Sequence, residues 1–93
     1  MVLVRRIVHE TLDDADRLGF SATSGERITV EVVTHRNGET AVLLDSPTGA
    51  DLVSKLVDDT ATYAVEAPET GRYRLCIVPA DSARVTATVT ERA

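Results

Sequence analysis

One cysteine and two histidines are the side chains best suited to nucleophilic or metal chemistry in this 93-residue chain. A catalytic thiol needs a nearby base and a lowered pKa. Cys76, His9 and His35 are far apart in the sequence, and no catalytic motif surrounds any of them. A zinc site needs three or four cysteine or histidine ligands, which three scattered residues do not supply. We therefore expect two surface imidazoles, an inert thiol, no metal site and no enzyme activity.

Acidic residues form two clusters along the chain. They are Glu10, Asp13, Asp14 and Asp16, followed by Asp58 and Asp59. Calcium takes six to eight oxygen ligands, but neither cluster has the twelve-residue loop with its glycine and terminal glutamate. The five glycines stand in separate turns, so no phosphate-binding loop is present either. The sequence predicts solvated loop acids and no cofactor.

Arginines and threonines alternate with apolar residues near the C-terminal end. The polar positions are Arg72, Arg74, Thr86, Thr88 and Thr90. One interpretation is a solvated sheet face. The other is an interaction face, because an arginine guanidinium can pair in bidentate fashion with a carboxylate of a partner protein.

Strands must position these side chains, because alternation with a period of two is the clearest pattern in the sequence. It runs through residues 26–34, 61–67, 72–78 and 84–90, each with one apolar and one polar face. Residues 40–45 are expected to form a further strand. Residues 2–10 and 51–57 are expected to be strands with weaker patterns, because Arg5, Arg6 and Lys55 interrupt the alternation.

Turn residues separate the strands every eight to twelve positions. Asn37-Gly38 tolerates positive φ, so residues 35–39 are predicted to close a hairpin between strands 26–34 and 40–45. Residues 11–19 allow two interpretations. Either they form a short helix capped near Thr11 and ended by Gly19, or a turn leads into a strand around 17–22 with Phe20 inside.

These patterns predict an all-β fold over residues 1–93, a single antiparallel β-sandwich of seven or eight strands with jelly-roll or Greek-key connections. The expected inner layer consists of Ile28, Val30, Val32, Leu43, Tyr63, Val65, Tyr73, Leu75, Ile77, Val85 and Val89.

The charge distribution narrows the choice of partners. Ten basic and fifteen acidic residues give a net charge of −5, and neither half of the chain is basic, so nucleic acid and anionic membrane are not expected partners. No signal peptide or membrane span is expected, which favours a cytoplasmic chain as given, or an extracellular one if it is excised from a secreted parent.

The segment Gly71-x-Tyr73-x-x-Cys76, with Leu43–Gly49 and Thr60–Glu66 before it, resembles the Golgi-dynamics (GOLD) domain of early-secretory transmembrane cargo receptors. The resemblance implies a non-catalytic β-sandwich that binds or assembles with proteins. A tyrosine corner is also expected, with Pro68 and Gly71 in the turn and the Tyr73 hydroxyl bonded to backbone near it.

A second resemblance leads to the same architecture. Asp14-x-Asp16, Phe20, Ser24–Val30, Pro47-x-Gly49 and Thr70-Gly71-x-Tyr73 are similar to the bacterial pre-peptidase C-terminal domain. That domain is an accessory module of secreted hydrolases. The alternative function is therefore an accessory binding domain that calcium could stabilise.

Self-association is the last expectation. Edge strands of a sandwich invite pairing unless charge, proline or a partner protects them. Residues 40–45 contain no basic residue and no proline, so this strand is either central or covered. A small domain also gains from burying apolar area between copies, and GOLD-like domains associate with one another. We therefore predict a homodimer, with any other protein partner left unidentified.

Overall fold

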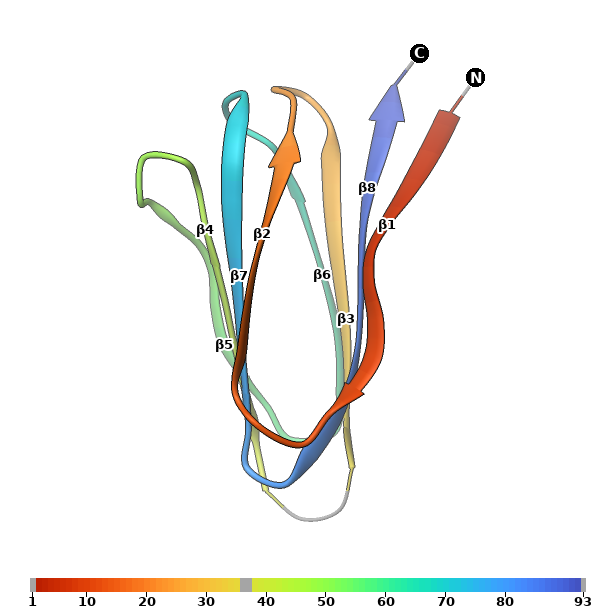
Figure 1. Cartoon of the computed structure of the whole chain (residues 1–93), viewed down its shortest axis with the longest axis vertical. Helices are drawn as coiled ribbons and strands as arrows, with labels where there is room; N and C mark the ends of the chain where they lie inside the picture. Colours follow the sequence, from red (N-terminus) through yellow and green to blue (C-terminus); the bar gives the residue numbers. More distant parts are fainter. Residues whose placement is uncertain (1, 36–37, 93) are drawn as a thin grey trace.

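Two four-stranded antiparallel sheets pack face to face (Figure 1). The structure, a computed structural model, describes residues 2–35 and 38–92, and within them it contains eight strands. They are β1 (Val2–Leu12), β2 (Asp16–Ala22), β3 (Arg27–His35), β4 (Thr40–Asp45), β5 (Asp51–Val57), β6 (Thr60–Glu66), β7 (Gly71–Pro79) and β8 (Ser82–Arg92). One sheet has the order β1-β8-β3-β6 and the other β2-β7-β4-β5.

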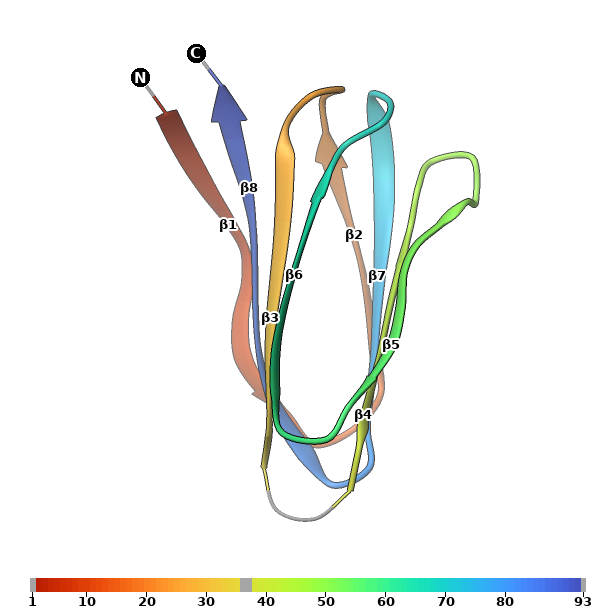
Figure 2. The same cartoon turned by 180° about the vertical axis from the view of Figure 1, so that it is seen from behind.

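Most connections pass from one sheet to the other. Among the eight described strands, only β4 and β5 are consecutive in the chain and also paired in one sheet. Figure 2 shows β5 and β6 leaving a shared turn into opposite sheets. These crossings are typical of the jelly-roll or Greek-key sandwich, so the predicted fold class is confirmed.

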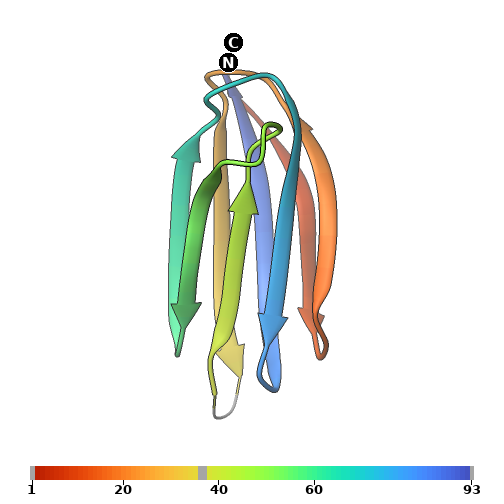
Figure 3. The ribbon, with the colours of Figure 1, turned by 90° about the vertical axis from the view of Figure 1, so that its left-hand side faces the viewer.

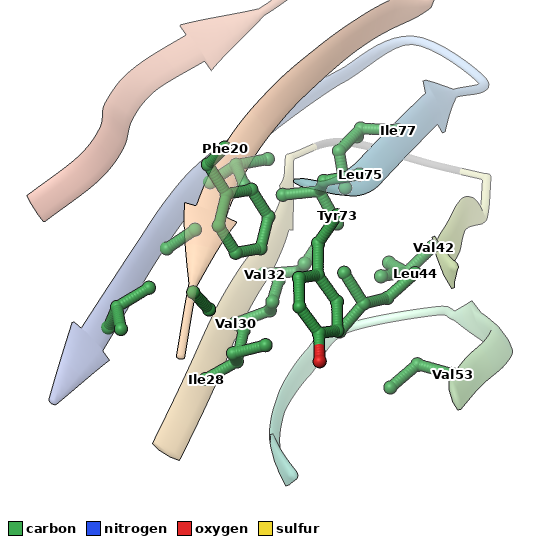
Figure 4. Packing of buried hydrophobic residues seen from close by; sticks show 14 of the residues in the cluster. Phe20, Ile28, Val30, Val32, Val42, Leu44, Val53, Tyr73, Leu75 and Ile77 are labelled. Atoms are coloured by element: carbon green, nitrogen blue, oxygen red, sulfur yellow. The ribbon is translucent and has the colours of Figure 1, made fainter. Parts of the chain in front are cut away.

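The core lies between the sheets and takes its side chains from the inward positions of both (Figure 4). Most of the expected inner layer is buried, namely Ile28, Val30, Val32, Tyr73, Leu75, Ile77, Val85 and Val89. Tyr63 and Val65 are half-buried on the edge strand β6. The prediction for Leu43 was wrong: Val42 and Leu44 point inward, so Leu43, between them, points outward.

The hairpin predicted at residues 35–39 is wrong. β3 pairs with β6 and β8, whereas β4 lies in the other sheet between β5 and β7. The apolar faces of β3 and β4 must oppose each other across the core, and a hairpin would have placed them side by side on one sheet. The chain therefore passes from one sheet to the other between β3 and β4. Asn37 lies outside the described residues.

Two buried threonines, one near the end of β3 and one at the start of β4, join the two sheets. The Thr34 hydroxyl donates to the Val57 carbonyl at 2.9 Å and lies 3.0 Å from the Thr40 hydroxyl. The Thr34 amide donates to the Asp59 carbonyl at 2.7 Å. These bonds tie the ends of β3 and β4 to the end of β5 and to the turn between β5 and β6.

Thr34→Val should lower the free energy of unfolding by about 1–3 kcal/mol, because it leaves the Val57 carbonyl and the Thr40 hydroxyl short of a partner in the interior. Urea unfolding measures the loss. Thr62→Val, the same substitution at an exposed position, should change stability by less than about 0.5 kcal/mol. Equal effects of the two substitutions would contradict the buried network.

Residues 11–19 contain a strand end, a turn and a strand start, so the helix interpretation was wrong and the strand interpretation is confirmed. β1 continues to Leu12, a bend covers residues 13–15, and β2 begins at Asp16. Phe20 is buried, because β2 pairs with β7 and brings Phe20 opposite Tyr73. A short helix could not have supplied this edge to the sheet.

A β-bulge explains the weak alternation of β1. The register with β8 shifts between Arg6 and Val8, and a bulge reverses which residues face inward. Arg5 consequently lies on the inner side, where its guanidinium donates to the Ser21 carbonyl of β2. The bond closes the side of the sandwich between β1 and β2.

The turn before β7 has a corner-like geometry. Tyr73 is fully buried, its hydroxyl donates to the Glu69 carbonyl, and the Glu69 amide donates back to that hydroxyl at 3.2 Å. Pro68 is exposed at the start of the turn. At Gly71 a β-carbon would stand 2.8–2.9 Å from the Pro47 ring, so the close approach of the two turns requires glycine.

β4 is a central strand, flanked by β5 and β7. The strand therefore needs no basic residue or proline to protect an edge, and of the two expected possibilities, central or covered, the first is correct. The edge strands are β1 and β6 in one sheet and β2 and β5 in the other. Among the described residues, no helix is long and apolar enough to span a membrane.

Candidate functional site

The outer surface of the β2-β7-β4-β5 sheet carries a group of charged side chains, which we call the arginine–aspartate face. It consists of Arg17, Arg72, Arg74, Asp45 and Asp51. These residues, with Leu18, Gly19, Leu43, Leu75 and Cys76, line a shallow cleft of about 500 Å³. Figure 3 shows this sheet in front, with β5 at one edge and β2 at the other.

The face has a basic half and an acidic half. Arg17 comes from β2, and Arg72 and Arg74 from β7, at alternate positions that all point away from the core. Asp45 ends β4 and Asp51 begins β5, and the two are cross-strand partners. Arg74 is the cross-strand partner of Asp45, so the halves meet between β7 and β4.

Gly19 shapes the basic half. A β-carbon at this position would stand 2.8 Å from Nε of Arg72 and 3.1 Å from its terminal nitrogen. The Arg72 side chain therefore lies over β2, directly above Gly19. Arg74 is the cross-strand partner of Gly19, so two guanidinium groups gather around the same point of the sheet.

Apolar side chains continue the face toward the start of β4. Leu43 and Cys76 are half-buried cross-strand partners, and one step further Ala41 pairs with both Val78 and Leu56. Leu56 is 66% exposed and Val78 41% exposed. Large apolar side chains exposed next to a charged cleft are typical of a binding surface.

The charged form of the Asp45 carboxyl group is disfavoured on this face. Partial burial raises the pKa of Asp45, the hydrogen bond to Asp51 and the charge of Asp51 raise it further, and Arg74 opposes them. The folded chain therefore binds more protons than the unfolded chain between the ordinary value of 3.8 and the raised pKa, and stability falls as pH rises through that window.

Asp51→Asn should raise the free energy of unfolding at neutral pH by roughly 0.2–1 kcal/mol, the size of a cross-strand pair. The gain should shrink as the pH falls toward 3.8, because protonation of Asp45 then relieves the repulsion in the parent chain. Urea unfolding at pH 7 and pH 4 measures both values. Asp58→Asn, which removes one charge from an exposed turn, should show no such pH dependence. A pH-independent effect of Asp51→Asn would contradict the coupling.

The sequence interpretation placed Arg72 and Arg74 on one face with Thr86, Thr88 and Thr90, and the structure separates them. β7 and β8 belong to different sheets. Their outward side chains therefore point to opposite sides of the sandwich, although both strands show the same alternation. The threonines lie on the outer surface of the β1-β8-β3-β6 sheet, where Thr86 shares a 2.8 Å hydrogen bond with His9.

The candidate catalytic groups are not brought together. Cys76 lies on the arginine–aspartate side, His9 lies on the opposite outer surface beside Thr86, and His35 ends β3. His9 also lies 3.3 Å from the guanidinium of Arg84. Within residues 2–35 and 38–92, no three histidine, cysteine, aspartate or glutamate side chains gather as metal ligands. Arg17, Asp45 and Asp51 were not identified as site residues from the sequence. Only the order of the strands brings them beside Arg72 and Arg74.

Two solved structures illustrate the proteins that share this fold. PliG, a periplasmic inhibitor of g-type lysozyme from Aeromonas hydrophila, matches with a TM-score of 0.59 and 13% identity over 95% of this chain and 83% of PliG. A Bacillus endospore appendage, from a family of disulfide-linked pili, matches with a TM-score of 0.51 and 13% identity over 89% of this chain and 88% of its own. Identities this low show a shared fold.

No protein-family model matches the chain, and no curated protein sequence matches it. The two structural neighbours are neither GOLD domains nor pre-peptidase C-terminal domains. The GOLD and pre-peptidase resemblances therefore stay predictions.

Proposed function

We propose that this chain is a non-catalytic protein-binding or assembly module whose binding surface is the arginine–aspartate face with the apolar side chains beside it. The observation that carries the proposal is a cleft lined by three arginines, from β2 and β7, on the same sheet surface as exposed Leu56 and Val78. Arginine is enriched at protein interfaces, where it offers planar bidentate bonds to carboxylates.

The opposite outer surface is the weaker candidate. Its threonines are half-buried along β8, and its His9 and Arg84 bond within the surface. The cleft of the arginine–aspartate face combines unlike charges with apolar groups, which is the composition of an interface with a polar part and an apolar part.

The structural neighbours support the general class of function, a protein that acts by binding other protein chains. One is named as an inhibitor of an enzyme and the other as a component of pili, and both roles depend on contact with another protein chain. Self-association is the form of this function that the resemblance to GOLD domains implies.

Matched charge reversals test the proposal. A tagged chain and its variants are expressed in the cells that naturally make the protein, and co-purifying proteins are quantified by mass spectrometry. Arg74→Glu changes the arginine–aspartate face, whereas Arg84→Glu makes the same change on the opposite outer surface. We expect the Arg74 variant to lose at least about tenfold of a specific partner, as for a charge truncated at an interface, and the Arg84 variant to keep it. Identical partner profiles for the parent and both variants would overturn the proposal.

A further inference from the structure

We infer that the arginine–aspartate face is self-complementary and that its partner is a second copy of this chain, bound face to face about a twofold axis parallel to the strands. The inference rests on the proposed function, because it uses the same surface, and it adds the identity of the partner and the symmetry. It follows from where the basic and acidic halves lie on the sheet.

The boundary between the halves runs along the strands. On the outer surface, β2 and β7 supply Arg17, Arg72 and Arg74, and β4 and β5 supply Asp45 and Asp51. The line between β7 and β4 therefore separates positive from negative charge.

Symmetry decides how two such faces can meet. A twofold interface places the same patch of both copies in contact. An axis in the interface and parallel to the strands, between β7 and β4, exchanges the two halves, so arginines of one copy face aspartates of the other. An axis at right angles to the strands would place arginine over arginine, which repulsion disfavours. The parallel axis also keeps the strand directions of the two sheets nearly aligned, as sheets prefer to pack.

Cross-strand register then predicts which side chains oppose each other. Arg74 and Asp45 stand on either side of the axis at one level, so Arg74 of each copy lies over Asp45 of the other. Both residues also neighbour each other within a chain, so four charges alternate around the axis.

Beside the axis, the next two levels along the strands are apolar, and Arg17 and Ser54 flank the first of them. Leu43 and Cys76 are partners at one level, and Ala41 and Val78 at the level after it. Under the same axis, Cys76 lies over Leu43 of the second copy and Val78 over its Ala41. The exposed side chain of Val78 is thereby covered.

The outer face of the β2-β7-β4-β5 sheet is long and narrow. Figure 1, seen down the shortest axis, shows both sheets edge-on, so each sheet face spans the 40 Å and 16 Å extents of the molecule. A pair that approaches the roughly 800 Å² per partner of standard interfaces would therefore use the full length of the strands.

Two charge-reversal variants, examined alone and as a mixture, test the inference. Arg74→Asp alone should place aspartate over aspartate, and Asp45→Arg alone should place arginine over arginine. We expect sedimentation velocity to show a dimer for the parent at tens of micromolar, and self-association at least about tenfold weaker for each variant. An equimolar mixture of the two variants should dimerise, because every contact across the axis then joins opposite charges. Thermal melts of each variant alone establish that it folds.

Cys76 gives an independent readout, because it is the one cysteine in the chain and lies beside the predicted axis. Face-to-face sheets are about 10 Å apart, so a bis-maleimide with a spacer of that length should link two copies of the parent and of the mixed variants. Linking of Arg84→Glu should equal that of the parent. In either single variant alone, the reagent should modify Cys76 without linking two chains.

A parent chain that sediments as a monomer at all these concentrations overturns the inference, as does a dimer that both single variants preserve. The proposed function is judged separately by the co-purification experiment. A monomer whose specific partner is lost on Arg74→Glu keeps the proposed function without the dimer. A monomer whose partners do not respond to that variant removes both.

Discussion

Tyr73→Ala is expected to lower the free energy of unfolding by about 3–5 kcal/mol, the usual cost of truncating a buried aromatic side chain. The ring is fully buried near the start of β7 and stacks on Phe20 with centroids 5.9 Å apart. Its hydroxyl satisfies both the carbonyl and the amide of Glu69. Because a domain of this size has only about 5–15 kcal/mol of stability, the melting temperature should fall by more than about ten degrees.

Two variants separate the ring from the hydroxyl. Tyr73→Phe keeps the packing and loses the bonds to Glu69, so it should cost about 0.5–1.5 kcal/mol. Tyr63→Ala removes the other tyrosine, which is half-buried on an edge strand, and should cost clearly less than Tyr73→Ala. A Tyr73→Ala protein that melts within a degree or two of the parent would show that the inward face of β7 is assigned wrongly.

Alternation predicted the faces of most strands because a side chain in a sheet has only two directions to choose between. It failed at Leu43, because the four successive apolar residues 41–44 do not alternate with polar ones and so do not show which of them face inward. There the direction is set by the partners of β4, since Val42 and Leu44 are level with Ile77 and Leu75 on the inner side.

The pairing of strands could not be predicted from alternation, because strands of both sheets show the same pattern. This limit explains two wrong predictions. One is the hairpin between β3 and β4, and the other is the placement of Arg72 and Thr88 on the same face. Asn37-Gly38 favours a tight turn locally, but the two flanking strands each need a partner sheet for one apolar face. Burial of both faces outweighs a local turn preference, because the hydrophobic term grows with the area removed from water.

The candidate site was predictable only in part for the same reason. Arg72 and Arg74 stand at alternate positions of one strand, so the sequence showed them together. Arg17, Asp45 and Asp51 come from three other strands, and no spacing along the chain relates them to β7. A surface assembled across four strands becomes visible only with the strand order, which depends on long-range contacts.

Phe20→Ala is expected to cost about 3–5 kcal/mol as well, and it tests the segment that allowed two interpretations. Phe20 is the one phenylalanine in the chain, is 5% exposed, and lies directly opposite Tyr73 in the register of β2 with β7. Its loss leaves a cavity at the edge of the core and removes the stacked ring contact. Leu18→Ala, two residues earlier on the same strand and half-buried, should cost less.

A double-mutant cycle measures how far the two rings act as a unit. Stacked aromatic pairs contribute about 0.5–1.5 kcal/mol beyond the area they bury, so Phe20→Ala combined with Tyr73→Phe should equal the sum of the single effects. Combination with Tyr73→Ala should fall short of the sum by about that amount, measured where urea still leaves a folded baseline. Full additivity in both cycles would mean that the rings do not touch. Because β2 is an edge strand held to the sheet by β7 alone, this contact would then have no part in fixing β2, and Arg17 with it, against the arginines of β7.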